Sequence, residues 1–115
     1  MSEFFQSEVV RAELAEIQEL QEEVYTNFFK FPSMSKDDQL YHIDILESLI
    51  EKQKIVYTRL SLSDDPAAKK MKDHITQGAV DMGIPNNVDM NVIFNDMMKM
   101  VKMMKNSVDR DQFPL

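Results

Sequence analysis

Turn-forming residues are scarce in this sequence. Only two glycines and four prolines occur among 115 residues, which leaves few places where the chain can reverse and predicts long regular elements. Between these breaks the apolar residues recur every three or four positions, and no stretch alternates as a half-buried strand would. The sequence therefore predicts an all-α fold.

The first expected helix runs from about Glu3 or Ser7 to Lys30, because Pro32 disfavours helical geometry in the residue before it. At 1.5 Å per residue it would be about 35–40 Å long, whereas a compact chain of this size has a radius of gyration of roughly 13 Å. One end would then protrude or pair with another chain, so a homo-oligomer through this helix is an open prediction. Its expected buried stripe is Val10, Leu14, Ile17, Leu20, Val24, Phe28 and Phe31.

Three further helices are expected. The second follows a cap at Ser35 and, with the widest apolar surface, is predicted to be central. The third starts at a cap on either Ser63 or Asp65 and closes at Gly83, and the fourth starts at an Asp89 cap. The positions expected to be buried are Leu40, Tyr41, Ile43, Ile45, Leu46, Leu49, Ile50, Val56, Tyr57 and Leu60, then Met71, Ile75, Ala79 and Met82, then Ile93, Met97, Met100, Met104 and Val108.

These elements predict a single domain over residues 1–108, in which two shorter helices pack on a long helical hairpin. Residues 109–115 are expected to form a flexible C-terminal tail. One shared core should contain Ile17, Leu20, Leu46, Ile50 and Ile75.

The chain is acidic, with a net charge of −7. This charge opposes binding to nucleic acid, so no direct sequence-specific nucleic-acid binding is expected. Glutamates three or four residues apart repel one another along the first helix. They form either a solvated face or a surface that docks onto a basic partner, and the candidate partner-binding residues are Glu13, Glu16, Glu19 and Glu23.

The fourth helix is rich in methionine, a flexible side chain that is over-used on surfaces that accept partners. Met98 and Met103 fall off the expected buried stripe and are candidates for a second, partner-facing stripe. The alternatives are a loose wrapping of the core, or a membrane-surface helix in which lysines interleave with the methionines. In the tail, Phe113 and Leu115 form a possible docking peptide, and a frayed end is the competing interpretation.

No residue pattern nominates catalysis or metal binding. His42 and His74 lack the repeated Glu-x-x-His pairs of helical metal sites and are expected to be solvated on the surface. The chain has no cysteine and no glycine-rich phosphate loop. We therefore expect a protein that is not an enzyme and needs no metal or cofactor.

The expected location is the cytoplasm. No apolar run is long enough to span a membrane, and the N-terminus lacks the pattern of a signal peptide. A small domain that folds without disulfides also fits a reducing compartment.

Several segments resemble a known family. The opening Phe4-Phe5-x-Ser7-Glu8-Val9 resembles an uncharacterised family of small helical proteins from cyanobacteria and the tailed phages that infect them (cyanophages). The resemblance covers about residues 1–105 and departs from host members at the Asp-Asp-Pro junction and from Asn106 onward. It implies an origin but no activity and no catalytic residue. The other matching segments are Leu46-Glu47-x-Leu49-Ile50-Glu51, Tyr57-Thr-Arg59-Leu60-Ser61-Leu62-Ser63-Asp64-Asp65 and, as in phage members, Val88-Asp89-Met90-Asn91.

The favoured expectation is a non-catalytic accessory protein, encoded by a cyanobacterial phage, that binds another protein. The leading alternative is a phage transcription accessory factor of the late-transcription coactivator type, bound to host RNA polymerase. Small size, acidic charge and helical character support this alternative by analogy alone. A membrane-surface adaptor is the third class, and an enzyme ranks last.

Overall fold

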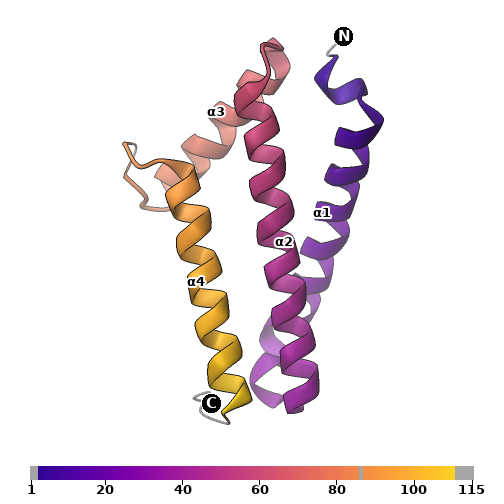
Figure 1. Ribbon diagram of the computed structural model, residues 1–115, viewed down its shortest axis with the longest axis vertical. Coiled ribbons are helices and arrows are strands. Elements are labelled where there is room, and N and C mark those ends of the chain that lie inside the picture. Colours follow the sequence, from indigo (N-terminus) through magenta and orange to yellow (C-terminus); the bar gives the residue numbers. More distant parts are fainter. Residues whose placement is uncertain (1–2, 86, 111–115) are drawn as a thin grey trace.

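The computed structural model describes residues 3–85 and 87–110, and most of these residues are helical (Figure 1). No strand occurs in these ranges, so the all-α single domain is confirmed. Four α-helices are flanked by two short 3₁₀ helices. In chain order these are η1 (Phe4–Gln6), α1 (Glu8–Asn27), η2 (Phe28–Ser33), α2 (Lys36–Leu62), α3 (Pro66–Asp81) and α4 (Met90–Asp109).

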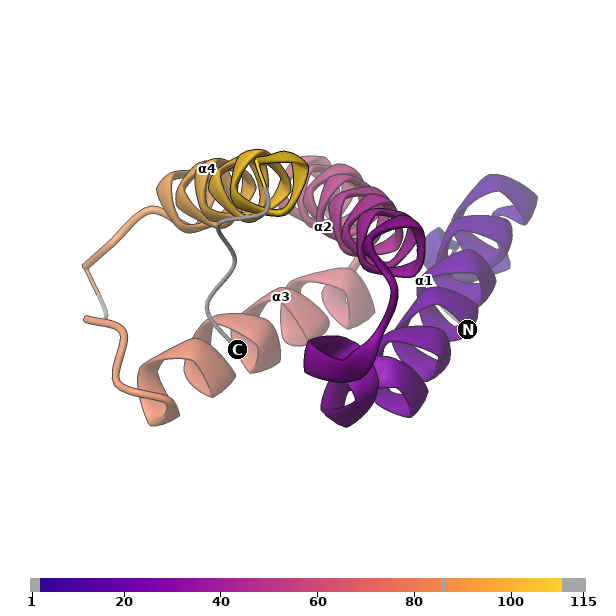
Figure 2. The same ribbon diagram turned by 90° about the horizontal axis from the view of Figure 1, so that it is seen from below.

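The longest helix, α2, is central, as the sequence predicted. The other two long helices, α1 and α4, run antiparallel to it on either side, and α3 crosses behind them (Figures 1 and 2). Lys36 Nζ donates a hydrogen bond to the backbone carbonyl of Asp109 at 2.9 Å, which places the end of α4 beside the start of α2. α1 and α4 have 20 residues each. Each of them forms an antiparallel pair with α2.

The buried residues recur at intervals of seven. This spacing keeps an apolar seam facing its neighbour in a left-handed supercoil. α2 has two seams, one of which includes Leu49 and Val56 and packs with α1. The seven-residue series are Val10, Ile17, Val24 and Phe31; Ile43, Ile50 and Tyr57; and Phe94, Val101 and Val108.

Two clusters make up the core in place of the single one predicted. Ile50 lies in the cluster between α2 and α4, which Phe31 closes at one end, whereas Ile17 lies in the cluster among α1, α2 and α3. Leu46 and Ile75 are half-buried and pack against both clusters. The predicted common core was therefore wrong in detail, because α2 buries two separate seams, about 100° apart around the helix, against α1 and α4.

Four residues predicted to be buried are exposed: Phe28, Tyr41, Met82 and Met100. Phe28 lies beyond the end of α1, and Met82 lies just past the end of α3. Met100 points away because the buried seam of α4 follows Phe94, Val101 and Val108. Both series on α4 have helical spacing, so only the packing could select between them.

Side-chain caps fix the start of each α-helix. Ser7 Oγ accepts the N–H of Val10, and Ser35 Oγ accepts that of Asp38. Asp65 is the cap of α3, which decides between the two alternatives, and Pro66 occupies the first turn. At the other end of α3, Gly83 has a φ of +101°, a backbone conformation that a glycine adopts readily.

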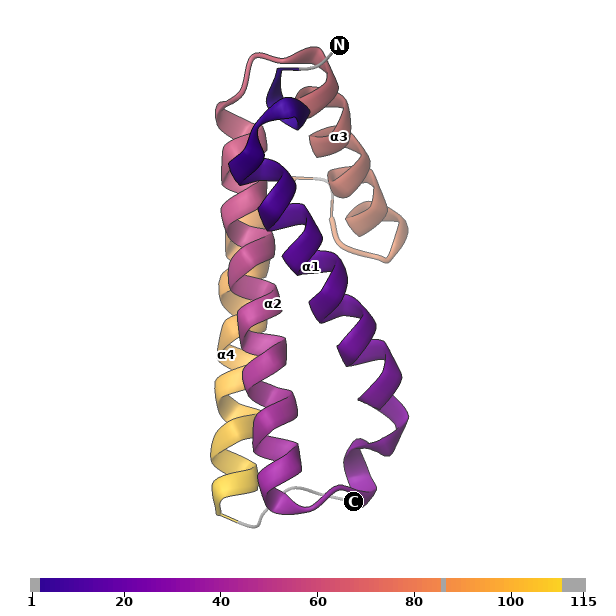
Figure 3. The ribbon, with the colours of Figure 1, turned by 90° about the vertical axis from the view of Figure 1, so that its right-hand side faces the viewer.

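The molecule is longer and flatter than a compact globule. Its radius of gyration is 16.1 Å and its principal extents are 49 × 32 × 19 Å, against the roughly 13 Å expected for this chain length. The cause is the layer formed by α1, α2 and α4, in which α1 leans away from α2 toward η2 (Figure 3). Such a shape exposes more surface than a compact bundle does.

Candidate protein-binding surfaces

Two of the four candidate glutamates connect α1 to α2. Glu13 is half-buried, and its Oε1 lies 2.6 Å from Arg59 Nε. Glu16 forms an ion pair with Lys52, and this hydrogen bond raises the pKa of the Lys52 ammonium. Both glutamates therefore balance charges of α2, a role that the sequence did not reveal because it depends on the register of the two helices.

The other two glutamates lie in different surroundings. Glu19 is exposed, whereas Glu23 is half-buried at a small pocket beside His42. The four candidates do not form one uniformly free acidic face. The acidic character of α1 nevertheless persists, since it contains six acidic side chains and one basic side chain.

The methionines of α4 divide differently from the prediction. Met98 is half-buried and packs against the core between α2 and α4, so its predicted exposure was wrong. Met103 is exposed, as is Met100. Lys105 Nζ lies 3.4 Å from Asp44 Oδ1, so at least one lysine of this helix faces α2. Phe113 and Leu115 lie outside the described residues.

Sequence reasoning missed one exposed apolar surface. Tyr25 at the end of α1 and Phe28 and Phe29 in η2 are all exposed, Phe29 to 89%. We call these three residues the aromatic corner. The rings of Phe28 and Phe29 meet edge to face with centroids 5.3 Å apart. The sequence held one indication of this surface, because Phe29 does not belong to the expected buried stripe of the first helix.

The surroundings of the aromatic corner are acidic. Residues 19–38, which form the end of α1, η2 and the start of α2, contain five acidic and two basic side chains. The corner lies at the end of α1, where this helix has leaned away from α2 (Figure 3), and its three side chains are exposed. An apolar centre flanked by carboxylates is an arrangement that suits a partner with basic residues around an apolar site.

His42 is buried, contrary to the prediction that it is solvated. Its exposed fraction is 5%, and its ring lies 5.4 Å from that of Phe31. Burial lowers the pKa of the imidazole, and the nearby Glu23 carboxylate partly opposes this effect. The adjoining pocket has a volume of about 230 Å³ and is lined by Glu23, Asn27, Met34, Asp38, Tyr41 and His42. His74 is exposed, as expected.

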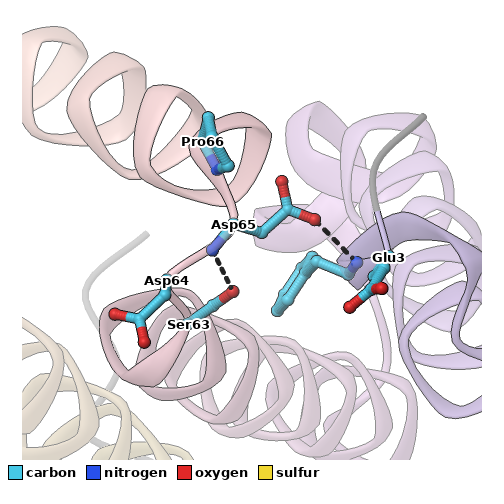
Figure 4. Close-up of a pocket in the computed structure, with 6 residues that line it drawn as sticks. Glu3, Ser63, Asp64, Asp65 and Pro66 are labelled. Atoms are coloured by element: carbon cyan, nitrogen blue, oxygen red, sulfur yellow. Dashed lines mark hydrogen bonds between the residues drawn. The ribbon is translucent and has the colours of Figure 1, made fainter.

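A pocket of about 620 Å³ opens at the junction of α2 and α3 (Figure 4). Three of its lining side chains, Glu3, Asp64 and Asp65, are acidic. Asp65 is already engaged, because its Oδ2 accepts the N–H of Phe4 and its Oδ1 accepts that of Ala67, both at 2.9 Å. The N–H of Asp65 donates in turn to Ser63 Oγ at 3.1 Å. These bonds fix the junction and hold η1 against it, which is a structural role.

A second pocket is apolar and lies between the helices. Its volume is about 300 Å³, and its lining includes Ile17, Val56, Tyr57, Ile75 and Phe94. Among residues 3–85 and 87–110, no three histidine, aspartate or glutamate side chains are grouped so as to hold a metal ion. None of the helices in these ranges is long and apolar enough to cross a membrane.

The chain belongs to a family described as a domain of unknown function, DUF1825, whose model matches residues 2–108. No curated protein and no solved structure matches the chain. The family match confirms the resemblance to an uncharacterised family.

Proposed function

We propose that this member of the DUF1825 family is a non-catalytic accessory protein that acts by binding another protein. The observation that carries the proposal is the aromatic corner formed by Tyr25, Phe28 and Phe29. Exposing three large aromatic side chains to water costs free energy. A group of exposed apolar side chains is therefore a mark of a binding site. Aromatic residues are also the side chains that contribute most of the affinity in protein interfaces.

The acidic flanks of the corner support a basic partner. Exposed carboxylates such as Glu19 and Glu22 would speed the encounter with a positively charged surface, and each would add little to the affinity once bound. Met100 and Met103 on α4 provide a second, more adaptable apolar surface. In this proposal the aromatic rings contribute most of the affinity, and the glutamates raise the rate of association.

We place this activity in the cytoplasm of a cyanobacterial cell infected by the phage that encodes the protein. The alternative is a transcription accessory factor that binds host RNA polymerase. The acidic charge favours contact with the polymerase protein over contact with DNA, since the phosphate backbone would repel α1. Both versions need the same surface and differ in the partner.

The test is affinity capture from infected cells with the partner identified by mass spectrometry. The informative variant combines Phe28→Ala with Phe29→Ala, and it should lose at least about nine-tenths of the captured partner, as expected when aromatic anchors are removed. The matched control is Met82→Ala, because Met82 is 87% exposed and lies on a different element, at the end of α3.

The control variant should capture the partner at the wild-type level. Recovery of RNA polymerase subunits in the wild-type sample, and their loss in the double variant, would favour the transcription factor. Equal capture by both variants would show that the aromatic corner is ordinary surface and would remove the basis of the proposal.

A further inference from the structure

The outward side of α2 has an apolar stripe of its own. α1 and α4 cover its two flanks, and α3 lies behind it, so the remaining side faces the viewer in Figure 1. Tyr41, Ile55 and Leu62 are exposed on this helix. Together with Ser48 they follow a seven-residue series, the same repeat that builds the seams inside the molecule. An exposed heptad stripe is the pattern of a helix that packs against one more helix.

This stripe is complementary to itself when reversed. In an antiparallel pair of α2 helices centred between Glu51 and Lys52, Tyr41 lies opposite Leu62 of the second copy. Ser48 then lies opposite Ile55, so that a small side chain meets a large one. Helices that interdigitate in this way fill the space between them.

The charges follow the same reversed order. In the same register Asp44 of one copy lies opposite Arg59 of the other, and Glu51 lies opposite Lys52. Within one chain Asp44, Lys52 and Arg59 already pair with neighbouring helices, yet each keeps exposed surface. Each of these side chains can therefore keep its partner within the chain and also contact an opposite charge of the second copy. Such complementary charges fix the register of an interface.

The charge of α2 also permits a close approach of two acidic chains. α2 contains five acidic and four basic side chains, whereas α1 contains six acidic and one basic. The C-terminal half of α1 recedes from the face that α2 presents (Figure 2). Self-association through α2 therefore brings together less like charge than self-association through α1 would.

The surface area leaves room for such an interface. The chain exposes 8002 Å², whereas a compact monomer of its 13.4 kDa mass exposes about 6,500 Å². The excess is about 1,500 Å², and a standard interface covers about 800 Å² on each partner. One ordinary interface would therefore cover about half of this excess.

We propose that the outward face of α2 is the interface of a homodimer, in which the two α2 helices pack antiparallel about a two-fold axis between Glu51 and Lys52. This proposal goes beyond the proposed function, because it concerns self-association and uses a different face from the aromatic corner. It also differs from the prediction that the first helix mediates self-association.

Sedimentation velocity across the micromolar range tests the oligomeric state. The wild-type protein should show twice the 13.4 kDa mass of one chain. Ile55→Asp would put an unpaired charge at the centre of the interface and should weaken dimerisation roughly a hundredfold or more. Val92→Asp is the matched control, because Ile55 is 47% exposed and Val92, on α4, is 49% exposed.

Far-UV circular dichroism should show wild-type helix content in both variants, so that any loss of the dimer reports the interface. A wild-type protein of single-chain mass at every concentration would overturn the proposal. A dimer that survives Ile55→Asp, or one that Val92→Asp disrupts equally, would do the same by placing the contact elsewhere.

Disulfide cross-linking tests the register, since the chain has no cysteine. A mixture of the Ser48→Cys and Ile55→Cys variants should form a cross-link between the two different chains about tenfold faster than either variant alone, because opposed residues bring their Cα atoms within disulfide range. Faster linkage of Ser48→Cys to itself would indicate a parallel pair and overturn the antiparallel arrangement. Absence of any linkage in a confirmed dimer would exclude this face.

Discussion

The rings of Tyr57 and Phe94 lie 5.8 Å apart at 56°, where α2 and α4 meet near the start of α4. Both side chains are buried, and they join the start of α4 to the central helix. Lys72 Nζ lies 5.7 Å from the centroid of the Tyr57 ring, so α3 contacts the same place. Three helices thus converge at this pair of rings.

Phe94→Ala should lower the free energy of unfolding by about 3–5 kcal/mol, because the substitution removes a buried ring and leaves a cavity that the helices fill only partly. Urea denaturation followed by circular dichroism measures the effect. Val92→Ala, two residues away and half exposed, is the control and should change stability by no more than about 0.5 kcal/mol. Equal effects of the two substitutions would contradict the observed orientation of α4.

The boundaries of the helices were largely predictable from the sequence. The residues that begin or end a helix affect the backbone only within a few positions, so their effect does not depend on distant contacts. They are Ser35, the Asp65-Pro66 pair, Gly83 and Asp89. The end of α1 was the exception. The chain enters a 3₁₀ helix at Phe28, four residues before Pro32, and this change turns Phe28 outward.

The Asp65 cap should be worth more than the Asp89 cap. Asp65 accepts N–H groups from both Ala67 and Phe4, whereas Asp89 Oδ1 accepts that of Asn91. Asp65→Ala should therefore destabilise by about 2 kcal/mol and Asp89→Ala by about 1 kcal/mol. Thermal denaturation of the two variants measures the difference, and a larger loss for Asp89→Ala would show that the link to η1 contributes nothing.

Contacts between helices were the part that the sequence could not supply. Arg59 and Lys52 lie far along the chain from Glu13 and Glu16, and a one-turn shift of α1 along α2 would change every partner. His42 is buried because Phe31 folds back onto it, a contact set by the path of η2. Such long-range relations leave no local pattern in the residues.

Protonation of His42 should couple stability to pH. Its pKa is lowered in the folded protein, by burial first and with the Glu23 carboxylate opposing, so the unfolded chain binds the proton more readily. Stability should thus be fully present above the unfolded pKa of about 6.5 and fall as the pH drops below it. Asp38 and Tyr41 also line the adjoining pocket.

The melting temperature between pH 7 and pH 5 measures this coupling. His42→Gln should flatten the decrease seen in the wild-type protein. His74→Gln should keep the wild-type slope, because His74 is exposed on α3. If the His42→Gln and wild-type slopes coincide, the proton at His42 does not influence folding.

Met98 and Met103 should respond differently to the same substitution, although the sequence suggested the same role for both. Met98 is half-buried against the core between α2 and α4, and Met103 is exposed on the opposite side of α4. Met98→Asp should cost about 2–3 kcal/mol, because it places a carboxylate among apolar side chains without a partner. Met103→Asp should change stability by no more than about 0.5 kcal/mol.

Urea denaturation of the two variants provides a direct comparison on one helix, five residues apart. A Met98→Asp variant as stable as Met103→Asp would mean that α4 is rotated relative to α2, and with it the assignment of Met100 and Met103 to the partner-facing surface would fail.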